Sequence, residues 1–116
     1  MTTAAELAAR HCHAVAPGTP PLDDRRIGEL LPLLDSAWAL ADDDRAIERE
    51  FRFMDFHETM AFVNAVAWIA HRADHHPDLQ VGYNRCTVRW STHAVGGLSE
   101  NDFICAAKVD ALLTGP

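Results

Sequence analysis

Hydrophobic and polar residues alternate along the chain at two spacings, one typical of helices and one typical of strands. Isoleucine and leucine side chains recur at helical spacing over residues 27–34, and Pro32 ends the regular part of this helix. Residues 37–41 and 47–53 alternate apolar side chains with small or charged ones, as strands with one buried and one wet face do. Asp42-Asp43-Asp44 lies between these strands, and we expect a hairpin turn there.

The longest predicted helix begins at Asp55, with Glu58 three residues later as a helix-start signal, and continues over residues 56–73. Its apolar side chains cover about half of its circumference, which is wider than packing on a sheet alone requires. Trp68 falls outside this arc. It is either a half-exposed aromatic side chain or part of a contact with another subunit. We favour the contact, because large exposed apolar surfaces mark interfaces.

The next stretch of the chain begins with His75-His76-Pro77. Because a proline disfavours helical geometry in the residue before it, we expect the histidine pair where the long helix gives way to extended chain. Residues 86–91 alternate as the last strand, which places His93 near that strand's end. A capping box over residues 99–102 then begins a closing helix that runs to about Leu113.

These elements follow one another as helix, strand, strand, helix, strand, strand and helix. The order predicts an α+β domain, with a four-stranded antiparallel sheet and three helices packed on one face of it. We assign residues 22–116 to this domain. Residues 1–21 are first alanine-rich and then proline-rich, and we expect an N-terminal extension and linker, a solvated tail that can begin as a short helix. It contains His11-Cys12-His13, for which no partner ligands at metal-site spacing are evident.

Composition narrows the classes of function. The 116 residues are enough for one domain with a real core, and a formal net charge of −7 argues against nucleic-acid binding. Cys12, Cys86 and Cys105 are widely spaced, so they indicate reduced thiols and not a disulfide framework. The sequence lacks a signal-peptide pattern and any apolar run of membrane-spanning length, so we expect a soluble cytoplasmic protein with no membrane contact.

The histidines are the candidate chemical groups. Imidazole has an ordinary pKa close to neutral, so His75, His76 and His93 could exchange protons with a substrate at working pH. The same residues could also form a three-histidine zinc site or a structural polar cluster. Adjacent side chains diverge and seldom face one metal, which favours acid–base chemistry over zinc. The residues by themselves leave all three readings open.

Several residues at fixed spacing resemble the signature of the pterin-4a-carbinolamine dehydratase family. The run His75-His76-Pro77 is followed by Tyr83, His93 and Asp102 at the family's intervals. Surrounding segments resemble the family too: Phe51-Arg52-Phe53, Phe62-Val63-Asn64, Tyr83-Asn84-Arg85, Ser91-Thr92-His93 and Gly97-Leu98-Ser99-Glu100. The resemblance covers residues 22–112, and it is more specific than a lone His-His-Pro would be.

The resemblance implies a hydro-lyase, 4a-hydroxytetrahydrobiopterin dehydratase. Such enzymes convert 4a-hydroxytetrahydropterin, left over after aromatic amino-acid hydroxylation, to quinonoid dihydropterin, which supports tetrahydropterin recycling. The N5 lone pair expels the C4a hydroxyl with help from an acid, and a base removes the N5 proton, so the reaction needs no metal and no cofactor. His75, His76 and His93 would be the catalytic residues, with their individual roles left open. The resemblance also implies a homodimer or homotetramer, through the helix at 56–73, and a functional link to a hydroxylase.

The resemblance also implies supporting roles in the site for other residues. Asp102 is expected both to cap the closing helix and to orient an imidazole, and Asp74 either to orient a histidine or to be a polar loop residue. His71 stands where many relatives carry an acidic residue, and we place it in the same supporting group. The expected substrate-binding residues are Leu79, Tyr83, Ser91 and Thr92. The alternative is a non-catalytic dimerisation or assembly module of the same fold, against which the intact histidines argue.

Overall fold

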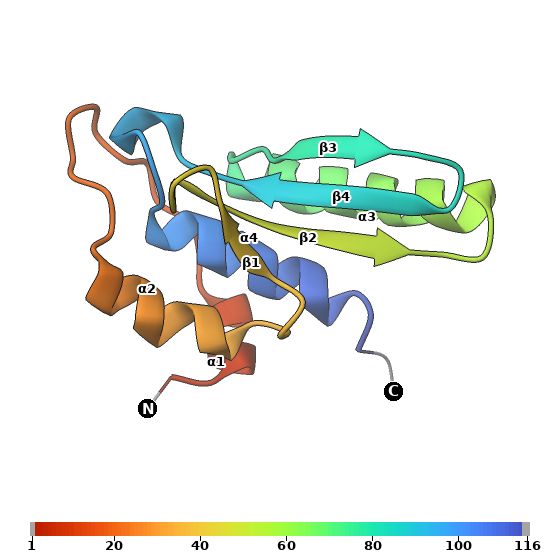
Figure 1. The fold of residues 1–116 in the computed structure, drawn as a ribbon, viewed down its shortest axis with the longest axis horizontal. Helices are drawn as coiled ribbons and strands as arrows, with labels where there is room; N and C mark the ends of the chain where they lie inside the picture. The colour runs from red at the N-terminus through yellow and green to blue at the C-terminus, as the bar shows by residue number, and fades with distance from the viewer. Residues whose placement is uncertain (1, 115–116) are drawn as a thin grey trace.

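The structure, a computed structural model, describes residues 2–114; Met1 and residues 115–116, at the outer ends of the predicted extension and domain, lie outside it. One antiparallel sheet has the strand order β1-β2-β4-β3 (Figure 1). The strands are β1 (Ala39–Ala41), β2 (Ala46–Arg52), β3 (Asp78–Val81) and β4 (Arg85–Trp90). The helices are α1 (Ala4–Ala9), α2 (Asp24–Leu30), α3 (Phe56–Ala73) and α4 (Glu100–Ala111), with 3-10 turns η1 (Leu31–Leu33) and η2 (His93–Val95). The predicted α+β fold is confirmed.

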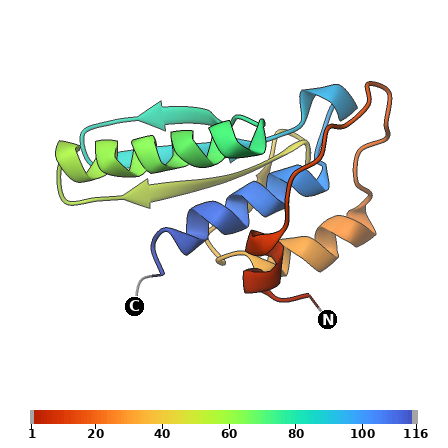
Figure 2. The same cartoon turned by 180° about the vertical axis from the view of Figure 1, so that it is seen from behind.

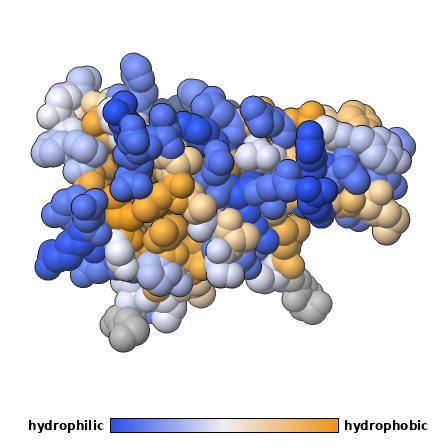
Figure 3. All heavy atoms as spheres, viewed as in Figure 1, coloured by the Kyte–Doolittle hydropathy of each residue, from blue (hydrophilic) through white to orange (hydrophobic). Residues whose placement is uncertain are grey.

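Helices α3 and α4 lie on one face of the sheet, as the view from behind shows (Figure 2). Strand β4 buries Cys86, Val88 and Trp90, while its Thr87 and Arg89 remain partly accessible in alternation with them. The face of the sheet turned away from α3 is largely hydrophilic (Figure 3). The sequence pattern of one buried and one wet face is therefore confirmed for this strand.

The β1–β2 hairpin turns at Asp42, Asp43 and Asp44, where the sequence predicted a turn. All three residues have positive φ, of 55°, 54° and 63°. Aspartate tolerates this left-handed conformation better than most residues, because its short polar side chain can bond locally. The Arg45 N–H donates to the Asp42 carbonyl at 3.1 Å and closes the turn, so that β1 and β2 pair antiparallel.

Helix α3 begins and ends where the local sequence predicted, within one residue. The Asp55 carboxylate accepts a hydrogen bond from the Glu58 N–H at 2.9 Å and caps the first turn. At the other end Asp74 is left-handed, with φ of 52°, and the His75 N–H donates to the Ala70 carbonyl at 3.2 Å. This helix end directs the histidine pair out of the helix before β3 begins.

The outward side of α3 carries apolar side chains. The helix buries Thr59, Phe62 and Val66 against the core, whereas Phe56 is 47% exposed and Trp68 61% exposed. Trp68 thus lies outside the packed arc, as predicted; the subunit contact at this surface stays a prediction. Within residues 2–114, neither α3 nor any other helix combines the length and apolar character needed to cross a membrane.

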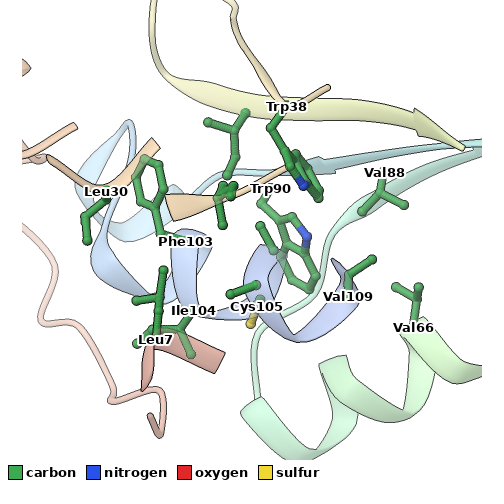
Figure 4. Packing of buried hydrophobic residues seen from close by; sticks show 14 of the residues in the cluster. Leu7, Leu30, Trp38, Val66, Val88, Trp90, Phe103, Ile104, Cys105 and Val109 are labelled. Atoms are coloured by element: carbon green, nitrogen blue, oxygen red, sulfur yellow. The ribbon is translucent and has the colours of Figure 1, made fainter. Parts of the chain in front are cut away.

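Helix α4 is the centre of the hydrophobic core. It contacts α1, α3 and β4, so it is enclosed on most sides (Figure 4). Its buried side chains are Asp102, Phe103, Ile104, Cys105, Ala106, Ala107 and Val109. The predicted capping box over Ser99 and Asp102 is present at its first turn. Because α4 is packed on several sides, its first residues are held firmly against the strand ends.

The N-terminal segment is not the solvated tail that the sequence predicted. Its first part is a helix, α1, and Leu7 of this helix is fully buried among the side chains of α4 (Figure 4). Thr3 caps the helix by accepting the Glu6 N–H at 3.1 Å. Local pattern could not reveal this packing, because a single leucine among alanines forms no hydrophobic stripe.

Candidate active site

A cavity of about 850 Å³ lies where α3 gives way to β3 and where β4 gives way to η2. His75 and His76 reach it from the first junction, and His93 reaches it from the second. We refer to it as the histidine cavity; it is lined by Cys12, His13, Ala14, Val15, Arg72, Ala73, Asp74, His75, His76, Asp78, Arg89, Ser91, Thr92, His93, Ala94 and Asn101. The structure therefore brings together the three histidines that the sequence singled out.

His75 is held by a buried carboxylate. Its Nε2 lies 2.6 Å from Oδ1 of Asp102, a residue with no solvent exposure. The other oxygen, Oδ2, accepts hydrogen bonds from the Thr92 hydroxyl at 2.7 Å and from the Ser99 N–H at 2.9 Å. Asp102 thus caps α4 and binds an imidazole at the same time, and both roles predicted for it are present.

The hydrogen bonds around Asp102 fix how His75 presents its ring. A carboxylate only accepts hydrogen bonds, so Nε2 of His75 carries a proton and donates it to Asp102. The Thr92 hydroxyl uses its one proton on Asp102, so the Ser99 hydroxyl, 2.7 Å away, donates to Thr92. This arrangement leaves Nδ1 of His75 as the nitrogen that can exchange a proton with a ligand.

The surroundings of His75 favour its protonated form. Burial is the largest single effect and disfavours a charged ring, but the hydrogen bond and charge of Asp102, with smaller contributions from Cys12 and Asp74, outweigh it. The pKa of His75 is therefore raised above its ordinary value. The ring also stacks on Trp90, with centroids 5.5 Å apart and planes 20° from parallel, which restricts its orientation.

His93 is positioned by a short loop. Thr92 and Gly97 exchange backbone hydrogen bonds, which join the two ends of the loop. The Thr92 N–H donates to the Gly97 carbonyl at 2.8 Å. Between them His93 begins η2, and Gly96 ends it in the left-handed conformation, with φ of 66°. The prediction that His93 lies near the end of the last strand is confirmed, three residues after Trp90.

Three other predicted residues also line the histidine cavity, namely Asp74, Ser91 and Thr92. Asp74 lies beside the histidine pair and ends α3. Asp102, not Asp74, makes the hydrogen bond to His75. Thr92 contributes mainly by holding Asp102 in place. The substrate roles predicted for Ser91 and Thr92 stay predictions, and the structure places both residues where such roles are feasible.

Besides Asp102, which acts through His75, three predicted residues do not line the cavity. Tyr83 lies in the turn between β3 and β4 and is 66% exposed, so it does not shape the site from within as predicted. The histidine cavity is at the other end of this hairpin, because an antiparallel strand carries the chain away from its start at about 3.3 Å per residue. Leu79 packs against the core, and the His71 ring lies against Trp68, with centroids 5.4 Å apart.

Sequence reasoning missed several lining residues. Asp78 and Arg89 pair across β3 and β4. The position of Arg89 between the buried apolar residues of β4 was the signal that could have indicated an accessible cation there. Cys12 also lines the cavity, and its sulfur lies 3.6 Å from that of Cys105. The pKa of Cys12 is lowered to about 7, mainly by its hydrogen bond with Cys105. No local signal connected residue 12 with this site.

The arrangement suits proton transfer. Among residues 2–114, no three histidine, cysteine, aspartate or glutamate side chains are grouped so that they could hold a metal ion. The cavity instead offers one imidazole bound to a carboxylate, that of His75, and three further histidines at its wall, His13, His76 and His93. Two or more imidazoles around one cavity can supply an acid and a base to the same ligand.

Comparison with known proteins identifies the family of this chain. The sequence model of the family described as Pterin 4 alpha carbinolamine dehydratase matches residues 20–112. A protein of Nitrosomonas eutropha (strain DSM 101675 / C91 / Nm57), provisionally named pterin-4-alpha-carbinolamine dehydratase, is 56% identical over 113 residues, which are 97% of this chain and 98% of the relative. A protein of Legionella pneumophila (strain Corby) with the same provisional name is 52% identical over 93% of this chain and 96% of its own.

A solved structure agrees with these sequence matches. The crystal structure of a transcriptional coactivator/pterin dehydratase from Brucella melitensis superimposes with a TM-score of 0.75 at 36% sequence identity. The match covers 79% of this chain and 97% of the Brucella chain. The family model, the full-length relatives and the shared fold lead to one conclusion: this chain belongs to the pterin 4 alpha carbinolamine dehydratase family.

Proposed function

We propose that this protein dehydrates 4a-hydroxytetrahydropterin to quinonoid dihydropterin by histidine acid–base catalysis. The observation that carries the proposal is the convergence of His75, His76 and His93 on one cavity, with His75 held by Asp102. The reaction removes a hydroxyl from C4a and a proton from N5, so its products are the dihydropterin and water. No electron is transferred, and we expect no metal or redox cofactor.

His75 is the group we assign as the acid. Its raised pKa favours a protonated ring near neutral pH, and its link to Asp102 stabilises the charge before the proton is donated. That proton goes to the leaving hydroxyl as the N5 lone pair forms the C4a–N5 double bond. His76 or His93, both lining the cavity, then takes the N5 proton as the base. In cytoplasm this activity would support tetrahydropterin recycling beside an aromatic amino-acid hydroxylase.

The first experiment measures the dehydration rate of 4a-hydroxytetrahydropterin, generated in place by a phenylalanine hydroxylase. We expect the wild-type protein to accelerate it, and His75→Ala and His76→Ala each to lower that acceleration by about 10²-fold, the scale of a lost general acid or base. His57→Ala is the matched control, because His57 is exposed at the start of α3 and does not line the cavity. A folded wild-type protein without any acceleration would refute the proposal and favour the non-catalytic dimerisation or assembly module.

We also propose a homodimer or homotetramer that forms through α3. The exposed Phe56 and Trp68 supply apolar surface on this helix, and covering such surface is favourable at about 25 cal/mol per Å². Light scattering at micromolar concentration should give a mass of two or four times 12.8 kDa. Trp68→Lys should shift the protein towards the monomer. A wild-type protein that is a single 12.8 kDa species would disprove this assembly.

A further inference from the structure

The segment before the family-matched region reaches the histidine cavity. The family model begins its match at residue 20, yet Cys12, His13, Ala14 and Val15 all line the cavity. Figure 2 shows this segment, in red to orange, running from α1 beside α4 towards η2. We propose that residues 12–15 form a wall of the substrate site, set in place by the side-chain amide of Asn101. This inference rests on the proposed function and adds a positioning residue to it.

Contacts with α4 hold the segment from Leu7 to His13. Leu7 is buried in the core, and the Lys108 ammonium donates a hydrogen bond to the Ala8 carbonyl. Arg10 pairs with Glu100 at 2.9 Å near the surface. Cys12 then packs against Cys105, with its sulfur 3.6 Å from the buried one. These contacts bring the chain to the mouth of the cavity in a defined position.

Asn101 holds the segment where it becomes the cavity wall. The His13 N–H donates to Oδ1 of Asn101 at 3.1 Å, and Nδ2 of Asn101 donates to the His13 carbonyl at 2.7 Å. One amide therefore satisfies both backbone groups of His13, as a neighbouring strand would. Asn101 directly precedes Asp102, the partner of His75, on α4. The first turn of α4 thus positions both the wall, through Asn101, and the proposed acid His75, through Asp102.

The wall supplies a kind of surface that the cavity otherwise has little of. Most lining residues are polar or charged; outside the wall only Ala73 and Ala94 are aliphatic, and the wall adds Ala14 and the larger Val15. A pterin is a flat bicyclic ring with polar edges and less polar faces, and ligand sites of this kind combine a few polar groups with apolar contact. Contact with a ring face exists before and during the reaction, so the wall should affect substrate binding and hence KM much more than kcat.

The test enlarges the wall at a position where the fold can accept it. Ala14→Trp adds a bulky side chain at an exposed residue that lines the cavity, and Ala16→Trp makes the same change at an exposed residue that does not. We expect Ala14→Trp to raise KM about tenfold with kcat within about twofold of wild type, and Ala16→Trp to change neither. Equal KM values for the wild type and both variants would overturn the inference.

A second pair of variants tests the role of Asn101. Asn101→Ala should raise KM without changing the pH dependence of kcat, because His75 and Asp102 keep their contact. Asp110→Asn is the control for stability on the same helix; Asp110 bonds Trp38 at 2.8 Å and does not line the cavity. Its KM should equal that of the wild type. If Asn101→Ala and Asp110→Asn raise KM equally, the effect is general loosening of α4, and the positioning role is wrong.

A binding measurement separates this inference from the proposed function. Calorimetric titration with 7,8-dihydrobiopterin, a stable pterin, gives a dissociation constant without turnover. If the wild type binds the pterin but does not dehydrate the carbinolamine, a Kd raised by Ala14→Trp and not by Ala16→Trp still supports the wall and refutes the catalytic role. If the wild type is active and Ala14→Trp affects neither Kd nor KM, the wall alone is refuted. A wild type that neither binds nor reacts refutes both.

Discussion

Replacement of Asp102 by asparagine is the sharpest test of how the site is built. Asparagine keeps the shape of the side chain but has one acceptor oxygen where aspartate has two. The best arrangement keeps that oxygen on Thr92 and Ser99 and turns the amide NH₂ towards His75. Nε2 of His75 must then accept a hydrogen bond, so the proton moves to Nδ1 and the ring is held neutral.

The expected cost follows from the contacts that change. Asp102 is fully buried, and the bond lost is a charge-assisted one of 2.6 Å, so we expect a loss of about 1.5–3 kcal/mol in the free energy of unfolding where His75 is protonated. The pKa of His75 should fall from its raised position to below its ordinary value, because the partner now favours the neutral ring. The dehydration rate should fall by about 10²-fold.

The stability loss should depend on pH in a definite direction. Because folding raises the pKa of His75, the stabilisation from its protonated form is fully present below the ordinary histidine pKa of about 6.5. It is lost as pH rises through the raised pKa of the folded protein. The difference in unfolding free energy between wild type and Asp102→Asn should therefore be largest below the ordinary histidine pKa and shrink as pH rises through the raised pKa of His75.

The assays are an NMR titration of the His75 ring, denaturant unfolding at several pH values, and the dehydration rate. Asp110→Asn is the control, since it removes a carboxylate of the same helix that bonds Trp38 and Arg49 instead of a histidine. It should lower stability and leave the pKa of His75 unchanged. If Asp102→Asn leaves the His75 pKa raised, or the rate within about threefold of wild type, the reasoning about this pair is wrong.

Two further predictions concern residues for which the structure differs from the sequence-based prediction. Leu7→Ala should lower the unfolding free energy by about 2–5 kcal/mol, because it leaves a cavity in the core. A change below about 0.5 kcal/mol, measured by denaturant unfolding, would mean that Leu7 is not packed and that the predicted solvated tail was correct. Tyr83→Ala should leave KM and kcat within about twofold of wild type, because the side chain is exposed at the end of the hairpin away from the cavity. A tenfold rise in KM in the dehydration assay would contradict that placement.

The sequence by itself determined the order of the strands and long helices, both ends of α3 and the start of α4. Asp55 begins α3, the capping box at Ser99 begins α4, and Pro77 follows the end of α3, because each of these signals acts within a few residues of the chain. The alternation of β4 showed which side chains are buried. The histidine-rich stretch indicated His75, His76 and His93 before any resemblance was considered, and the structure brings all three to one cavity.

Only the tertiary structure decided which residues meet. The resemblance led us to expect that Asp102 orients an imidazole, but only the structure shows that this imidazole is His75, 27 positions away. Leu7 and the cavity wall likewise pack on a helix more than 80 residues away. Tyr83 fits the sequence signature but lies at the far end of its hairpin. Local sequence patterns cannot predict how far apart such residues lie in space. That distance depends on strand register, on how α4 packs on the sheet, and on where the N-terminal segment packs.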